Sequence, residues 1–189
     1  MNAFRRIKKE IEALRHRYPE VEILFGVEAN IVDTDGTVDL PTVILRELDF
    51  LLVGYHKLVR PRSLAFLWQV IRNFWSGWTK TTSASLRAAN TAAITAAVRR
   101  YPITAITHPG LQIDIDTAEL GRVCKGYGTF LEINSSYGSE VEQYIREALP
   151  TGVSSLLRSD AHSPVTARTY SAITFQFFSG TVTHFLLSH

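Results

Sequence analysis

The sequence VSSLLRSDAH, residues 153–162, decides the fold class because it joins an apolar run to two residues that can bind metal. Val153 to Leu157 has the length and composition of a buried strand. Asp160 and His162 stand two residues apart, so on extended backbone their side chains point to the same side. Such a pair suits a divalent metal such as zinc or manganese, although an isolated Asp-x-His is more often a cap or a surface turn.

The same pattern occurs three more times along the chain. Three further apolar runs lead into residues that can ligate a metal: 23–27 into Glu28, 50–55 into His56 and 103–107 into His108. Helical patterns alternate with these runs, which favours parallel strands. Active sites of β/α barrels lie at the carboxyl ends of their strands, so four such ends predict one shared metal site in an α/β barrel.

Length and composition indicate one globular domain. The chain has 189 residues and a formal net charge of +2, which allows a single domain with a sizeable core. The single Cys124 excludes an intrachain disulfide and a cysteine-based zinc site, and it fits a reducing compartment. The charged N-terminus predicts no signal peptide, and no apolar stretch is long enough to span a bilayer. A cytoplasmic location is therefore expected.

Charge is distributed unevenly along the sequence. Between Phe50 and Ile113 there is no Asp or Glu. Basic residues occur throughout this part of the chain: Lys57, Arg60, Arg62, Arg72, Lys80, Arg87, Arg99 and Arg100. A field of one sign attracts phosphate groups.

An aromatic helix is predicted inside this basic region. Its apolar positions recur at helical spacing and are Leu64, Leu67, Trp68, Ile71, Phe74, Trp75 and Trp78. One interpretation is a helix that covers the barrel or a partner subunit; the other is a surface for nucleic acid or a membrane. The tryptophans fall with the leucines, which favours packing, so neither nucleic acid nor a membrane is the expected partner.

The remaining elements follow from caps, turns and periodicity. Helices are predicted at 4–18, 42–48, 83–100, 116–124 and 139–148, and a fourth strand at 129–133. Asp33-Thr34-Asp35-Gly36 predicts a turn. From Val165 to His189 the only Asp, Glu, Lys or Arg is Arg168, where typical composition would give about a quarter. This tail is interpreted as a strand pair or an adhesive extension.

Five stretches together resemble the PHP (polymerase and histidinol phosphatase) family of metal-dependent phosphoesterases. They are Gly26-Val27-Glu28-Ala29-Asn30-Ile31, Gly54-Tyr55-His56, Thr107-His108-Pro109-Gly110, Leu131-Glu132-Ile133-Asn134-Ser135-Ser136 and Ser159-Asp160-Ala161-His162-Ser163-Pro164. Their order and spacing agree with the family across Phe4 to Pro164.

The resemblance implies a distorted seven-stranded β/α barrel that holds up to three divalent ions of zinc, manganese or iron. It implies that Glu28 bridges two of them and that His56 and His108 complete one of these two. Asp160 would ligate the other and His162 the third. Metal-activated water would then attack a small phosphate monoester, as in histidinol phosphatases. Lys57, Arg60 and Arg62 are candidates to hold the phosphate, and Glu132 is expected to support the barrel interior.

The resemblance also has two departures. The family opens with a strand that carries a His-x-His motif, and nothing of that kind precedes Phe4. We therefore expect a PHP-like domain at 1–164 that lacks the first strands and some ligands, with fewer metals. The second departure is an atypical tail at 165–189.

Three hypotheses follow. The first is a metal-dependent phosphoesterase acting on a small phosphorylated substrate, in a chain that could form a homo-oligomer. The second is a catalytically inactive remnant that at most binds a metal. The third is a basic-aromatic interaction module.

Overall fold

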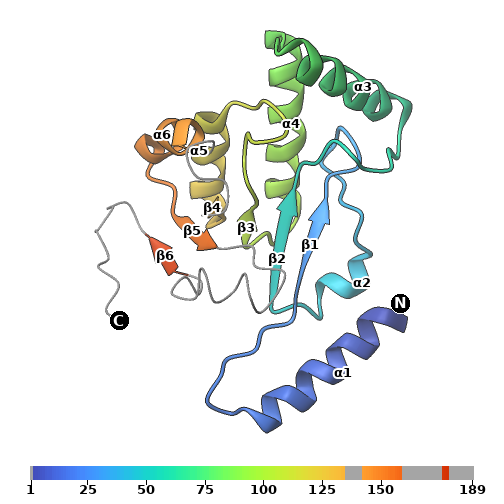
Figure 1. Cartoon of the computed structure of the whole chain (residues 1–189), viewed down its shortest axis with the longest axis vertical. Helices are drawn as coiled ribbons and strands as arrows, with labels where there is room; N and C mark the ends of the chain where they lie inside the picture. The colour runs from blue at the N-terminus through green and yellow to red at the C-terminus, as the bar shows by residue number, and fades with distance from the viewer. Residues whose placement is uncertain (1, 135–141, 159–175, 179–189) are drawn as a thin grey trace.

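The structure is a computed structural model that describes residues 2–134, 142–158 and 176–178. Its centre is one sheet of six strands in sequential order, β1 to β6, flanked by helices (Figure 1). The strands are β1 (Gly26–Asn30), β2 (Phe50–Gly54), β3 (Ala105–Ile106), β4 (Phe130–Asn134), β5 (Ser155–Arg158) and β6 (Gln176–Phe178). The helices are α1 (Asn2–Arg17), α2 (Thr42–Leu45), α3 (Leu64–Thr79), α4 (Ala84–Arg100), α5 (Thr117–Tyr127) and α6 (Glu142–Ala148), with a 3-10 turn at Leu149–Thr151.

The first five strands are parallel and the sixth is antiparallel to β5. The prediction of an α/β protein with parallel strands is thus confirmed. Parallel strands need crossover connections that return the chain to the end of the sheet where each strand begins, and here helices provide them. The predicted turn is also confirmed: Gly36 adopts φ +78° and its N–H donates to the Asp33 carbonyl.

The first strand begins later than predicted. Residues 22–25 precede β1, and Phe25 donates its N–H to the Asp49 carboxylate at 2.7 Å. Pairing with β2 starts only at Gly26, opposite Phe50. Glu28 therefore lies in the middle of β1, and the prediction that it follows the strand end is wrong. The helix predicted at 42–48 is likewise shorter, ending at Leu45.

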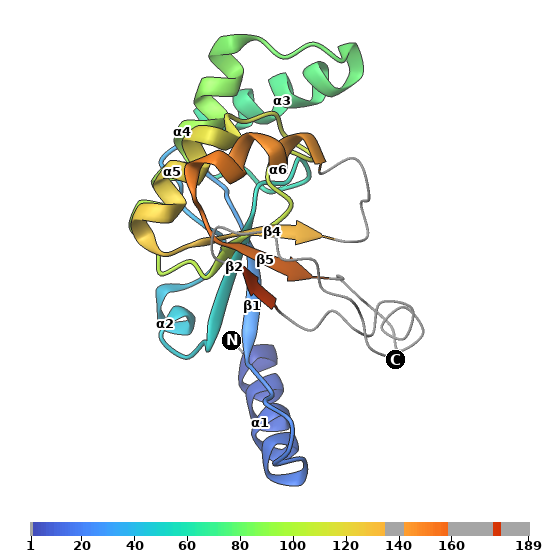
Figure 2. The same ribbon diagram turned by 90° about the vertical axis from the view of Figure 1, so that its left-hand side faces the viewer.

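The main core lies between the sheet and helices α4 and α5, which cover one of its faces (Figure 2). Ile94, Val98 and Leu120 are almost fully buried there. Cys124 is also buried in this core, and burial raises the pKa of its thiol to about 12. Because a thiol must ionise to react, Cys124 has the character of an inert core residue.

Helix α1 lies at the opposite end of the molecule from α3 in both views (Figures 1 and 2). Ion pairs connect it to the rest of the chain, from Lys8 to Glu47 at 3.0 Å and from Arg15 to Asp49. Arg15 also donates to the carbonyl of Ile23 at 2.6 Å. Within the described residues, no helix has both the length and the apolar composition needed to cross a membrane.

Helix α3 packs against the rest of the protein through the face opposite to the one expected. Its buried residues are Phe66, Gln69, Val70 and Asn73. The tryptophan-bearing side is open: Trp68 is 61%, Trp75 58% and Trp78 77% exposed. The prediction that the tryptophans pack with the leucines is therefore wrong within this chain.

A buried amide network explains this orientation of α3. The Asn90 side-chain carbonyl accepts from Gln69 at 2.9 Å and from Asn73 at 3.0 Å. The Asn90 amide donates to the Asn73 side-chain carbonyl at 2.9 Å and to the carbonyl of Asp114 at 3.0 Å. Gln69 also donates to the Tyr55 hydroxyl at 2.8 Å. Asn90 on α4 and Tyr55 after β2 thus keep the polar side of α3 inside, because buried amides need hydrogen bonds.

Replacing Asn90 by Ala should lower the free energy of unfolding by about 2–4 kcal/mol, because it leaves buried amides on α3 without their hydrogen-bond partner. Chemical denaturation followed by circular dichroism measures the change. Arg99→Ala, at an exposed position of the same helix, should change it by less than about 0.5 kcal/mol. Equal effects of the two substitutions would contradict a role for the network.

Candidate metal centre

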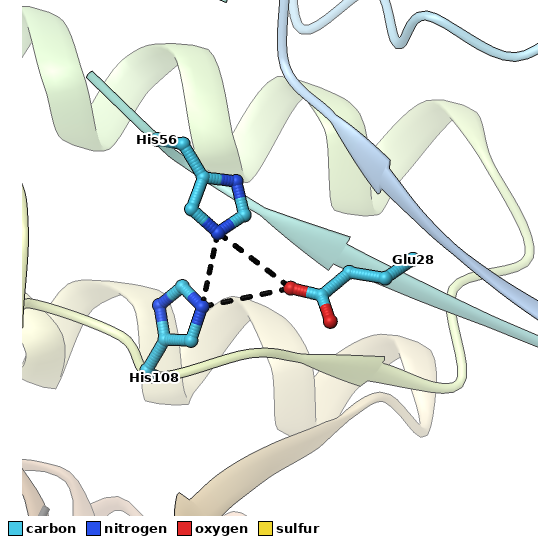
Figure 3. Close-up of side chains that lie close together, drawn as sticks. All are labelled: Glu28, His56 and His108. Atoms are coloured by element: carbon cyan, nitrogen blue, oxygen red, sulfur yellow. Dashed lines mark hydrogen bonds and ion pairs between the residues drawn. The ribbon is translucent and has the colours of Figure 1, made fainter. Parts of the chain in front are cut away.

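Glu28, His56 and His108 converge on one point at the sheet (Figure 3). The Nε2 atoms of His56 and His108 lie 3.0 Å apart. Glu28 Oε1 lies 3.6 Å from His56 Nε2 and 3.5 Å from His108 Nε2. The three ligand atoms thus form a nearly equilateral triangle. His108 is buried, whereas the side chains of Glu28 and His56 are partly exposed.

The three residues come from neighbouring parallel strands. Glu28 is opposite Leu52 in the pairing of β1 with β2. His56 follows the end of β2 by two residues, and His108 follows the end of β3 by two residues. Since β1, β2 and β3 are adjacent and parallel, their side chains meet although 80 residues of sequence (28 to 108) separate the outer two.

Asn30 fixes the tautomer of His56. The Asn30 amide donates to Asp39 Oδ2 at 2.7 Å, so its carbonyl oxygen Oδ1 faces His56 Nδ1 at 2.6 Å. A carbonyl oxygen only accepts, so Nδ1 must carry the proton. In the neutral ring, Nε2 then presents a lone pair to the triangle. This is the usual arrangement behind a metal-bound histidine, whose second nitrogen donates to an oxygen.

The surroundings keep the His56 ring neutral. Burial lowers the pKa of His56, and the neighbouring His108 acts in the same direction. Glu28 and Asp39 oppose this effect with their negative charges. The net lowering of the pKa favours the unprotonated imidazole, which is the form that binds metal.

Thr107 and Gly54 shape the space around the triangle. The Thr107 hydroxyl donates to Glu28 Oε1 at 2.9 Å and thereby orients the carboxylate. A Cβ at Gly54 would collide with the His56 ring and would lie 2.8 Å from Thr107 Oγ1. The absence of a side chain at Gly54 therefore provides the space that the His56 imidazole occupies.

His108 adopts an unusual backbone conformation. Its φ is +31°, a region that side-chain-bearing residues seldom occupy. The backbone N–H of His108 donates to the buried Glu132 carboxylate at 2.6 Å. The tight turn continues through Gly110, which has φ +86°. Glu132 thus holds the backbone of a triangle residue and stands outside the triangle itself.

The donor set fits a divalent transition metal. Two ligand atoms at about 2.05 Å from a tetrahedral zinc lie about 3.3 Å apart. The three separations of 3.0, 3.5 and 3.6 Å bracket this value. Two imidazoles and one carboxylate also leave coordination positions for water or substrate, which is typical of catalytic metal sites. Zinc, manganese and iron all accept such ligands.

The other predicted site residues are placed as follows. The Lys57 ammonium lies against Gly77 of α3. Arg60 and Arg62 line an open cavity of about 440 Å³, with Asp39 and Pro41 also in its wall. Asp160 and His162 lie outside the described residues.

Sequence reasoning missed three supporting residues. Asn30, Asp39 and Thr107 orient the ligands or their partners and lie outside the triangle itself. Asn30 could have been found from its position, since it stands two residues after Glu28 and shares its side of the strand. Asp39 follows the predicted turn by three residues, and nothing in the sequence links it to His56.

Relatives among curated proteins are named as probable phosphatases. One from Acetivibrio thermocellus is 31% identical over 151 residues, which are 75% of this chain and 53% of that protein. One from Thermoanaerobacter sp. is 32% identical over 161 residues, or 80% and 57% respectively. One from Shewanella baltica is 33% identical over 117 residues, or 61% and 37%. The chain spans about half the length of the first two, and no protein-family model matches it.

We predict that the purified chain binds about one zinc or manganese ion, as measured by plasma mass spectrometry after gel filtration. The double variant His56→Ala, His108→Ala should lose the metal because it removes two of the three ligands. His16→Ala removes an exposed histidine on α1 and should retain it. Metal that persists in the double variant would place its site elsewhere.

Asn30→Ala should weaken metal affinity by about 10–100-fold, the usual cost of removing a group that orients a histidine ligand. Competition with a chromophoric chelator measures this affinity. Thr34→Ala, on the neighbouring exposed turn, serves as the control and should leave affinity unchanged. Unaltered binding in Asn30→Ala would show that the hydrogen bond to His56 does not prepare the ligand.

Proposed function

We propose that this chain carries the metal site of a phosphoesterase that hydrolyses a small phosphate monoester with metal-activated water. The observation that carries the proposal is the triangle that Glu28, within β1, forms with His56 and His108, which follow the ends of β2 and β3. The names of the relatives agree with phosphatase chemistry. A PHP-type barrel with a histidinol-phosphatase-like site is the finer form of the same proposal.

The residues of the chain have distinct roles in this chemistry. A bound divalent ion would lower the pKa of a water molecule and withdraw charge from a phosphoryl oxygen. Glu28 would supply a negative ligand, and His56 and His108 would bind through imidazole nitrogens, which ligate metals in their uncharged form and would leave the ion electrophilic. Asn30 and Thr107 hold two of these ligands in place. Asp160 and His162 remain proposed ligands of further ions.

The cavity lined by Arg60 and Arg62 is the proposed substrate site. Its wall combines Arg60 and Arg62 with apolar residues such as Val38 and Leu40. Guanidinium groups bind phosphate oxygens in a bidentate manner, and the apolar wall suits an organic leaving group. Asp39 lies in the same wall and bonds to Asn30, which connects the cavity with His56. Lys57 is the third candidate for phosphate binding.

Turnover of p-nitrophenyl phosphate by the metal-loaded chain tests the proposal. His56→Ala with His108→Ala should abolish turnover, and His16→Ala should preserve it. Arg60→Ala with Arg62→Ala should raise KM about tenfold or more with little change in metal content, because a charge-assisted contact with phosphate contributes about 1.5–3 kcal/mol.

Two results would decide against the proposal. Folded, metal-loaded protein without turnover of any of a panel of phosphate monoesters would favour the catalytically inactive remnant. Turnover that survives loss of His56 and His108 would assign the activity to other residues.

A further inference from the structure

The exposed side of α3 forms a continuous apolar surface, which we call the tryptophan face. It consists of Leu64, Leu67, Trp68, Ile71, Phe74, Trp75 and Trp78, with exposed fractions from 37% at Ile71 to 83% at Leu64. These positions recur every three or four residues, so they lie along one stripe of the helix. The rings of Trp75 and Trp78 lie 5.3 Å apart. Water-exposed apolar side chains gathered on one stripe mark interaction sites.

The tryptophan face has a cationic border. Arg72 lies on α3 between the positions of Trp68 and Trp75, and it contacts the hydroxyls of Ser83 and Ser85. Lys80 caps the helix with φ +54°. The Lys57 ammonium reaches Gly77 from the preceding loop. At the amino end of α3, Ser63 donates a hydrogen bond to the carboxylate of Asp33. The positive charge is therefore concentrated toward the carboxyl half of the helix.

We propose that the tryptophan face binds the surface of an anionic lipid bilayer. An apolar stripe with tryptophans and a basic border is the pattern of helices that lie in the membrane interface. Tryptophan favours this region because its ring is apolar while its N–H can bond to headgroups. Lysine and arginine at the border are attracted to anionic headgroups. The helix would lie on the membrane without crossing it.

Other occupants agree less well with these observations. In a two-fold contact between copies that pairs the two α3 helices in parallel, the basic borders would meet each other, and like charges repel. Single-stranded nucleic acid stacks its bases on aromatic rings, but Leu64, Leu67 and Ile71 make much of this stripe aliphatic. Placement supports a lipid surface too, because α3 lies at one end of the molecule in both views (Figures 1 and 2).

The chain contains its own reporter for this proposal. All three tryptophans of the protein, Trp68, Trp75 and Trp78, lie on α3. Tryptophan emission, excited selectively over that of tyrosine, therefore reports only on this helix. Phosphatidylcholine vesicles that contain phosphatidylglycerol should shift the emission to shorter wavelength and sediment with the protein. Vesicles of phosphatidylcholine alone, or raised salt, should weaken binding about tenfold or more, since each basic group near an anionic surface contributes favourably.

Two pairs of matched variants assign the binding to α3. Trp75→Ser with Trp78→Ser should lower vesicle binding about tenfold or more, while Tyr127→Ser with Val43→Ser removes exposed apolar groups elsewhere and should not. Arg72→Gln with Lys80→Gln should weaken binding to anionic vesicles, whereas Arg5→Gln with Lys9→Gln, on exposed positions of α1, should not. Circular dichroism verifies that each variant is folded.

Several outcomes would overturn the proposal. One is folded protein that binds neither type of vesicle. Another is loss of binding only in the α1 variant, which would transfer the membrane contact to that helix. A concentration-dependent dimer that shields the tryptophans without lipid would assign the face to a second copy. Binding to a mixed-sequence DNA oligonucleotide, lost in the same α3 variants while vesicle binding is absent, would assign it to nucleic acid.

Discussion

The parallel pairing of β1, β2 and β3 is the constraint on which the rest of the structure depends. Its register places Gly26 opposite Phe50 and Asn30 opposite Gly54, and then Val53 opposite Ile106. A shift of one residue in β1 would turn Glu28 and Asn30 to the other side of the sheet. The same shift would move Ala29, now almost fully buried, out of the core. Hydrophobic burial on one side of β1 therefore fixes the positions of the polar groups on the other.

Sequence reasoning predicted the parts of the site that are repeated and local. Apolar runs ending near His56 and His108 predicted neighbouring strands because strand patterns are visible over a few residues. The position of Glu28 within β1 was not predictable, since the pairing of Gly26 with Phe50 depends on where another segment begins. The roles of Asn30 and Asp39 depend on side-chain contacts with His56, which is distant in sequence.

The orientation of α3 shows why amphipathic patterns can mislead. The apolar stripe predicted burial of the tryptophans, because apolar surface normally leaves water. Asn73 and Gln69 lie on the opposite side of the helix, which the same rule assigns to solvent. Their partners are Asn90 on α4 and Tyr55 after β2, and no local pattern reveals these partners. A network of satisfied amides competed with apolar burial and determined which side faces inward.

The amide network also has a mechanical consequence. Each of its hydrogen bonds is satisfied in one alignment of α3 on α4, so sliding by one turn would leave several buried amides unpaired. Tyr55 belongs to this network and is the residue immediately before His56. Helix α3 is therefore held rigidly beside the segment that carries His56, and a surface bound by α3 would lie in a fixed orientation to the three candidate ligands.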